Sequence, residues 1–304
     1  MKIRDIIEQR GNSLSFEFFP PKTQEAETQL FDAIKRLEIF RPSFVSVTYG
    51  AGGGTRKTTR RVVEHIMLET SLTPMPHLTC IGQSEDELKA ILRDYQQLGI
   101  ENILALRGDP PRETAWSPAD DGHCHATDLV RLARSFDGLS IGVAVYPEGH
   151  VEAPSLETDM FYTKQKIEAG ADFAITQMFF DNRFFYDFME RAEKAGIRIP
   201  VIAGIMPITD IGKMKQFCQT CGSTLPSSLV RRMETAGSPG EVARIGIDFA
   251  TRQCEDLWQH GVRFFHFYTL NRAEAVTEVL HNSSLEGLLG ETSEEDLTSS
   301  ILVT

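Results

Sequence analysis

Two carboxylates in this sequence lie close to the ends of short apolar segments. Glu17 is enclosed by aromatic residues in SFEFFPP, and Asp109 follows Arg107 and Gly108 in ALRGDPP. Removal of water raises the pKa of a carboxyl group, so a Glu between aromatic neighbours is a candidate general acid. A buried Glu paired with a nearby Arg or Lys is the alternative interpretation. The segment by itself does not decide between a general acid and a structural ion pair.

Further polar residues follow other apolar segments. Thr48, Tyr49 and Ala51 lead into a run of glycines whose backbone could approach a planar or anionic ligand closely. Gln177 can donate and accept hydrogen bonds, which suits the amide-like edge of a heterocycle. His77 stands alone within PHLTC, and a lone His is more often structural than a ligand. The glycine loop and Gln177 favour recognition of a small organic molecule.

Several familiar sites are missing from the sequence. The spacing of a phosphate-binding Walker loop is absent, and no G-x-G-x-x-G follows a strand segment, so any dinucleotide must be bound in another way. No His, Cys or carboxylate cluster has metal-ligand spacing, and we predict no metal site. Cys218 and Cys221 form a C-x-x-C, but zinc would need a second ligand pair.

Composition narrows the class of protein. The 304 residues carry a net charge of −12, which argues against a broad nucleic-acid surface, and 41% are hydrophobic, as in a globular protein with a large core. No stretch approaches the apolar length of a signal peptide core or a membrane span. Five cysteines at irregular spacing do not suggest a disulfide framework. We therefore expect a cytoplasmic protein with reduced thiols and no membrane partner.

Strand and helix patterns alternate along the chain. β-branched and aromatic runs predict eight strands, over residues 14–20, 44–50, 75–81, 102–107, 140–146, 173–179, 200–205 and 263–268. Helical spacing predicts helices over residues 23–40, 58–68, 85–98, 126–135, 156–169, 182–195, 210–219 and 242–260.

This order predicts an α/β fold with a single (β/α)8 TIM barrel over residues 1–280. An open, doubly wound sheet is the alternative. Residues 281–304 are acidic and rich in Ser and Thr, and we expect a peripheral, partly mobile extension. In a barrel the carboxyl ends of all strands meet at one face, so Glu17, Asp109 and Gln177 are expected to lie there together.

Eight motifs in order strengthen this interpretation. They are SFEFFPPK, FVSVTYGA, PHLTC, ALRGD, YPEGH, AGADFAITQMFFD, AGIMP and FHFYTLNRAE, and they span about residues 14–280. The set closely resembles the bacterial methylenetetrahydrofolate reductase family. The resemblance implies a barrel that binds FAD, takes a hydride from NADH or NADPH and reduces 5,10-methylenetetrahydrofolate to 5-methyltetrahydrofolate in a ping-pong reaction that feeds methionine synthesis.

The resemblance also assigns roles to individual residues. Glu17 is implied to protonate the folate nitrogen, and Asp109 to contact both the flavin and the pterin. Folate contacts are implied for Gln177, Lys213, Phe217 and Arg272, with Phe217 packing where nicotinamide and folate alternate. The implied FAD contacts are Thr48, Tyr49, Ala51, His77, Arg107, Gly108, Asp109, His125, Ala126, Ala144, Tyr146, His150, Asp159, Tyr162, Gln165 and Lys166.

Four positions depart from the familiar family pattern. His125 replaces a Tyr, Tyr162 an Asn, Gln165 an Arg and Lys213 a Gln. Loss of the Arg at 165 removes a strong charge-assisted contact to the FAD diphosphate, so flavin is expected to bind less tightly. Lys213 could meet a polyglutamate tail or face solvent, and the sequence does not decide.

Two other classes of function were weighed. A metal-dependent or Schiff-base lyase would need a metal cluster or a catalytic Lys on a strand, and neither stands out. A barrel that only binds flavin or folate would need no acid, whereas Glu17, Asp109 and Gln177 are present together. The family also implies a homo-oligomer. The sequence leaves the choice of NADH or NADPH, or an electron-transfer partner, open.

Overall fold

Eight parallel strands form a closed barrel in the computed structural model, which describes residues 1–50, 55–109, 125–283, 285 and 288. Neighbouring strands pair in chain order, and the last pairs with the first. The predicted TIM barrel is confirmed, and the open sheet is excluded. The strands are β1 (Ser13–Phe18), β2 (Phe44–Val47), β3 (Pro74–Thr79), β4 (Asn102–Leu106), β5 (Ser140–Val145), β6 (Phe173–Thr176), β7 (Val201–Ile205) and β8 (Phe264–Tyr268).

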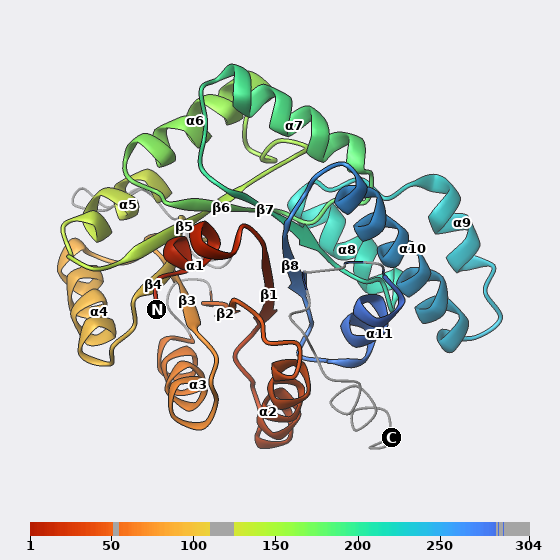
Figure 1. The fold of residues 1–304 in the computed structure, drawn as a ribbon, viewed down its shortest axis with the longest axis horizontal. Coiled ribbons are helices and arrows are strands. Elements are labelled where there is room, and N and C mark those ends of the chain that lie inside the picture. The colour runs from red at the N-terminus through yellow and green to blue at the C-terminus, as the bar shows by residue number, and fades with distance from the viewer. Residues whose placement is uncertain (51–54, 110–124, 284, 286–287, 289–304) are drawn as a thin grey trace.

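Helices surround the barrel (Figure 1). Several begin at side-chain caps, such as Thr23 before the second helix and the Ser84–Glu87 capping box before the fourth. The helices are α1 (Ile3–Arg10), α2 (Gln24–Glu38), α3 (Arg56–Glu69), α4 (Glu85–Gln97), α5 (Ala126–Arg134), α6 (Leu156–Glu168), α7 (Asn182–Lys194), α8 (Ile211–Cys221), α9 (Ser227–Glu234), α10 (Pro239–Gln259) and α11 (Glu274–Asn282).

Alternation along the strands separates two environments. On β1, Phe16 and Phe18 are buried against the surrounding helices in the main core, which also contains Val45 and Phe267. The intervening Glu17 instead faces the barrel interior, where it meets a side chain of the non-adjacent strand β3. The apolar residues of β1 therefore pack between the barrel and its helices, and its polar residue lies inside the barrel.

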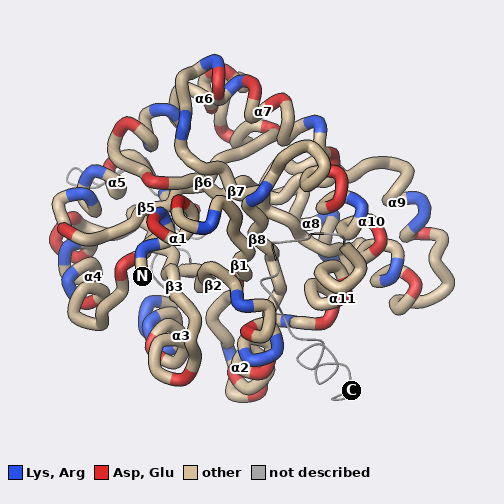
Figure 2. The backbone as a smooth tube through the Cα atoms, in the orientation of Figure 1, with Lys and Arg blue, Asp and Glu red and all other residues tan. Residues whose placement is uncertain are grey.

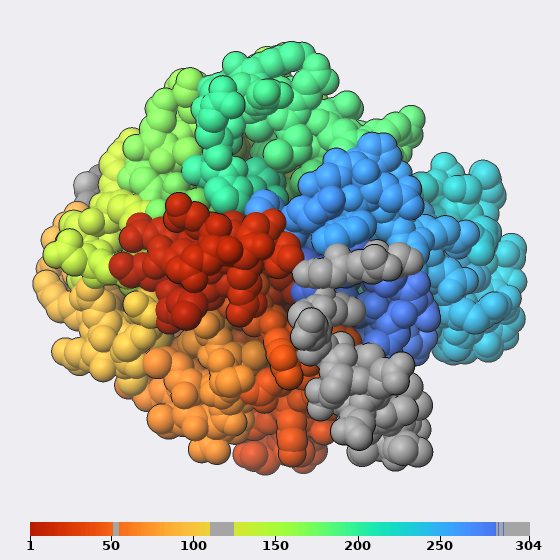
Figure 3. All heavy atoms as spheres, in the orientation of Figure 1, coloured from red at the N-terminus to blue at the C-terminus, as the bar shows by residue number. Residues whose placement is uncertain are grey.

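Helix α1 closes the amino-terminal end of the barrel, as Figures 1 and 3 show. Ile3 and Ile7 pack against Phe44 and Phe173, which belong to strands β2 and β6. The amide of Ile3 donates to Asn102 Oδ1 at 2.7 Å. We did not predict α1, because eight residues make a short pattern. Its signal was present in the i, i+3, i+4 spacing of its isoleucines before Gly11.

Other predicted boundaries were also wrong. The segments 44–50 and 173–179 continue as apolar sequence beyond the strand, but pairing ends at Val47 and Thr176. Of the residues that follow, Tyr49, Met178 and Phe179 are buried in loops, and an apolar run does not distinguish a buried loop from a strand. Helices α9 and α11 were not predicted either. The proposed domain boundary at 280 remains a prediction, and the predicted mobility of the tail falls mostly on residues outside the described part.

Charged residues lie mostly on the helices and loops around the barrel (Figure 2). None of the helices in the described ranges combines the length and the apolar character that crossing a membrane requires.

The close approach of α10 to the loop after β7 yields a stability prediction. A Cβ added at Gly246 would lie 1.8 Å from the carbonyl oxygen of Ile208, so Gly246→Ala forces the helix away from the barrel. We expect a loss of about 1–3 kcal/mol in the free energy of unfolding, measured by urea denaturation. Gly240→Ala on the same helix is the control, because its Cβ would meet only Ser238 Oγ at 3.9 Å. Equal stabilities of the two variants would contradict this packing.

Candidate active site

The carboxylate of Glu17 lies inside the barrel among histidine and serine side chains. Its Oε2 is 3.3 Å from Nε2 of His77, 3.3 Å from Nε2 of His266 and 3.4 Å from Oγ of Ser46. The side chain is 17% exposed, so it is held by the protein yet remains open to a ligand. The alternative of an Arg or Lys partner is wrong for the described residues, because the partners there are two imidazoles and a serine hydroxyl.

The expected direction of the Glu17 pKa is also wrong. Burial raises this pKa, but the nearby charge of His77 and the hydrogen bond from His266 outweigh it and lower the pKa to about 2. The aromatic neighbours Phe16 and Phe18 do not desolvate the carboxylate, since they lie on the other face of β1. In the ligand-free protein Glu17 is therefore ionised at neutral pH.

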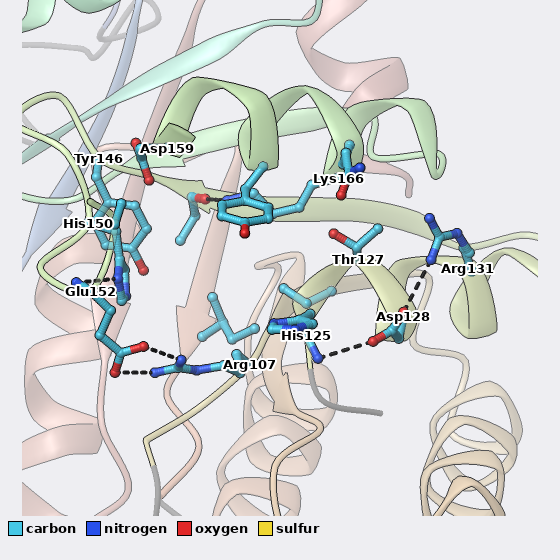
Figure 4. A pocket seen from close by; sticks show the side chains of 17 residues that line it. Arg107, His125, Thr127, Asp128, Arg131, Tyr146, His150, Glu152, Asp159 and Lys166 are labelled. Carbon is cyan, nitrogen blue, oxygen red and sulfur yellow. Dashed lines mark hydrogen bonds and ion pairs between the residues drawn. The ribbon is translucent and has the colours of Figure 1, made fainter. Parts of the chain in front are cut away.

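A separate cavity of about 340 Å³ opens at the carboxyl ends of β4 and β5, beside α5 and α6 (Figure 4). It brings together ten of the sixteen predicted FAD contacts. These are Arg107, His125, Ala126, Ala144, Tyr146, His150, Asp159, Tyr162, Gln165 and Lys166. Thr48, Tyr49, His77, Gly108 and Asp109 are not part of its lining, and Ala51 lies outside the described residues.

The polar groups of this cavity fit a ligand with hydroxyl groups. Asp159 is buried, burial raises its pKa, and its Oδ2 has no hydrogen-bond partner within the described residues. An acceptor of this kind suits a polyhydroxylated chain such as that of a flavin cofactor. Lys166 Nζ donates to the carbonyl of Ala144 at 2.5 Å, and desolvation lowers its pKa to about 8. Desolvation raises the pKa of Tyr146 to about 12.

An ion pair crosses one side of the same cavity. Both terminal nitrogens of Arg107 donate to the carboxylate of Glu152, with Nη2 at 2.9 Å from Oε1, and this contact raises the Arg107 pKa. The amide of Glu152 donates to Nδ1 of His150, whose ring meets Tyr146 edge-on at 4.7 Å. Figure 4 shows Arg107 and His125 across the cavity from Asp159 and Lys166. Sequence reasoning missed Glu152, because an acidic residue in a loop gives no distinct pattern.

The predicted substrate residues are not joined to Glu17 by hydrogen bonds or ion pairs in the described part of the chain. Asp109 is exposed after β4, and Gln177 is half-buried, with Oε1 accepting the amide of Met178 at 3.0 Å. Phe217 is 41% exposed on α8. Lys213 faces solvent with its Nζ 3.7 Å from Asp210, and Arg272 is exposed after β8.

Sequence reasoning also missed the role of Tyr268 on β8. Its hydroxyl donates to the carbonyl of Thr176 at 2.7 Å, directly before Gln177. The Thr176 hydroxyl in turn accepts the amide of Gly204 at 2.8 Å. A Cβ at Gly204 would approach the Tyr268 ring to 2.9 Å, so the glycine leaves space for it. Tyr268 thus fixes the end of β6 from which Gln177 projects.

Comparisons with known proteins point to one family. The sequence profile of the family described as methylenetetrahydrofolate reductase matches residues 2–284. A 5,10-methylenetetrahydrofolate reductase of Salmonella typhimurium is 41% identical over 280 residues, covering 91% of this chain and 93% of that protein. Methylenetetrahydrofolate reductase (NADH) 1 of Arabidopsis thaliana is 35% identical, covering 93% of this chain and 50% of that protein.

A solved structure shares the fold at low sequence identity. The protein, from Clostridium thermocellum, is described as binding two copies of 5-methyl-5,6,7,8-tetrahydrofolic acid. It superposes with a TM-score of 0.61 at 13% identity, covering 92% of this chain and 96% of that one. This similarity supports the barrel fold alone.

The buried carboxylate of Asp159, whose Oδ2 has no hydrogen-bond partner within the described residues, generates a second prediction. Desolvation raises its pKa, so its charge destabilises the fold once the pH exceeds that raised pKa. In flavin-free protein at pH 7, Asp159→Asn should keep or increase the free energy of unfolding, by up to about 1 kcal/mol. Below about pH 4 any gain should disappear, because the carboxyl is then protonated in both states.

A carboxylate with partners provides the control. Asp172 accepts from Arg4 and Arg134 and from the amide of Ile141 at 2.7 Å, so Asp172→Asn should lose about 1–3 kcal/mol. A comparable loss in Asp159→Asn would show that Asp159 has stabilising partners in solution.

Proposed function

This chain belongs to the methylenetetrahydrofolate reductase family, and from that premise we propose that it reduces 5,10-methylenetetrahydrofolate to 5-methyltetrahydrofolate with NADH or NADPH. One observation carries the proposal beyond the family. A single carboxylate, Glu17, projects from β1 into the barrel, remains partly exposed and contacts two histidines. An acid with built-in proton donors is what opening of the folate's methylene bridge needs.

The cavity between α5 and α6 is proposed to hold FAD. When bound, FAD supplies the hydride chemistry, while the protein supplies binding and orientation. Asp159 would accept hydrogen bonds from hydroxyl groups of the cofactor, and Lys166 and Arg107 would provide positive charge toward its diphosphate. NAD(P)H and folate react in turn at the same place, in a ping-pong sequence.

Glu17 serves only the second of these half-reactions. It is ionised in the ligand-free protein and acquires a proton when folate covers it, because exclusion of water disfavours the carboxylate. The proton is then transferred to the folate nitrogen as the bridge opens. Gln177, fixed through Tyr268 and Thr176, orients the pterin. Further contacts with the folate are proposed for Asp109, Phe217, Arg272 and Lys213.

Glu17→Gln tests this division of labour. The variant keeps the shape and a hydrogen-bonding oxygen but has no acid, so reduction of the flavin by NADH should remain within about twofold of wild type. Reoxidation by methylenetetrahydrofolate should fall by roughly 100-fold or more, the usual contribution of a general acid. Both rates are measured by anaerobic stopped-flow absorbance.

The matched control is Glu101→Gln. Glu101 pairs with the amino terminus beside β4, away from the proposed site, and this variant should retain both half-reactions. Equal slowing of both half-reactions in Glu17→Gln would contradict the assigned role.

Gln165→Arg tests the proposed cofactor site. Gln165 lines the cavity, and an added cation should strengthen contact with the diphosphate. We expect slower loss of FAD after dilution, followed by the rise in flavin fluorescence. Gln259→Arg at the end of α10 adds the same charge outside the cavity and should not slow FAD loss. Unchanged or faster loss in Gln165→Arg would place the diphosphate elsewhere.

A further inference from the structure

A row of polar side chains links three strands inside the barrel. Ser15 and Glu17 come from β1, His77 from β3 and His266 from β8. His266 is fully buried and touches two members of this row, with Nδ1 2.8 Å from Ser15 Oγ and Nε2 3.3 Å from Glu17 Oε2. Each ring nitrogen of His266 therefore has one polar partner, the Ser15 hydroxyl or the Glu17 carboxylate.

Ser15 determines which nitrogen of His266 carries a proton. The Ser15 hydroxyl has one hydrogen, and its contacts with the carbonyl of Phe265 at 3.1 Å and with Nδ1 of His266 at 2.8 Å can both be hydrogen bonds only if that hydrogen is donated to the carbonyl. In that arrangement the Ser15 oxygen accepts from His266, and Nδ1 carries the proton of that contact. A neutral His266 of this kind would present the bare lone pair of Nε2 to the carboxylate of Glu17.

Two acceptors facing each other at 3.3 Å are unfavourable unless a proton lies between them. We infer that His266 is the proton partner of Glu17: the pair retains one proton, on Nε2 or on Oε2, and delivers it to the substrate through Glu17. Ser15 is the positioning residue that enforces this state. The inference rests on the proposed function, which identifies the folate nitrogen as the group that receives the proton.

The transfer balances without any redox change. The proton moves from Nε2 of the imidazolium to Oε2, which leaves a neutral imidazole and a neutral carboxylic acid. The O–H bond then breaks as an N–H bond forms on the folate, and the bridge C–N bond breaks with its electron pair staying on that nitrogen. Glu17 is left as a carboxylate opposite a bare Nε2, and the pair takes up one proton from water to begin again.

The surroundings favour His266 over His77 for this role. The His77 Nε2 also lies 3.3 Å from Glu17, but within the described residues this buried nitrogen makes no hydrogen bond, whereas the His266 Nε2 does. His266 is further held by Phe44, stacked at 5.9 Å, and by the edge of Tyr268 at 5.4 Å. The Tyr268 hydroxyl donates its hydrogen to the carbonyl of Thr176, so it does not supply a proton to Glu17 or His266. His77 contributes charge, which holds Glu17 ionised until substrate binds.

The protonation state of His266 tests the inference directly. The flavin-loaded, oxidised protein is labelled with ¹⁵N-histidine, and the His266 signals are assigned by their loss in His266→Gln or, if that variant does not fold, by their shift in Ser15→Ala. The inference predicts a protonated Nδ1 at neutral pH and a second proton shared with Glu17. A neutral ring with a proton on Nε2 alone would overturn it, since Ser15 would then be donating to Nδ1.

Kinetics of the two half-reactions provide an independent readout. Ser15→Ala frees His266 to adopt the other tautomer, and His266→Gln keeps a donor to Glu17 but has no transferable proton. Both should reduce the rate of reoxidation by methylenetetrahydrofolate roughly tenfold or more, alter its pH profile and leave reduction by NADH within about twofold. Ser140→Ala, a buried serine at the amino-terminal end of β5, and His65→Gln, on α3, are matched controls.

The outcomes separate the two proposals. If wild type is reduced by NADH but not reoxidised by the folate, the proposed function fails, while the ¹⁵N signals still decide the state of His266. If wild type turns over and both variants match it in rate and pH profile, the inference about His266 is overturned and the proposed function stands.

Discussion

The contact of one Glu17 oxygen with two imidazoles is the interaction on which this site depends. It exists because side chains alternate along β1, so that Phe16 and Phe18 anchor the strand to the helices while Ser15 and Glu17 face inward. A shift of one residue in the register would exchange these layers and leave a carboxylate in the apolar core. The stability of the barrel and the placement of its acid are therefore set by the same pairing of β1 with β2 and β8.

The cavity proposed to bind the cofactor is separate from the side chains proposed to supply the proton. The cavity beside α5 and α6 contains Asp159, Lys166 and the Arg107–Glu152 pair, whereas the barrel interior contains Glu17 with Ser15, His77 and His266. Charges in one region can thus be arranged for a diphosphate without disturbing the acid in the other. The end of β6, held by Tyr268, is the place from which Gln177 can bridge them.

The strand order and the closed barrel could be predicted from the sequence, because apolar runs alternated regularly with helical spacing. The grouping of the cavity residues, from Arg107 to Lys166, followed from the family motifs rather than from any local pattern. The short helix α1 and the ends of β2 and β6 could not be predicted, since buried loops and strands share apolar sequence. The Glu17 pKa was misjudged because its histidine partners, His77 and His266, come from distant strands that local sequence does not connect.

The most direct measurement of the central claim follows the visible spectrum of the purified protein under anaerobic conditions. Addition of NADH or NADPH should bleach a flavin spectrum, and subsequent addition of 5,10-methylenetetrahydrofolate should restore it with formation of one equivalent of 5-methyltetrahydrofolate. A protein that takes up no flavin, or whose reduced flavin is not reoxidised by the folate, would contradict the account.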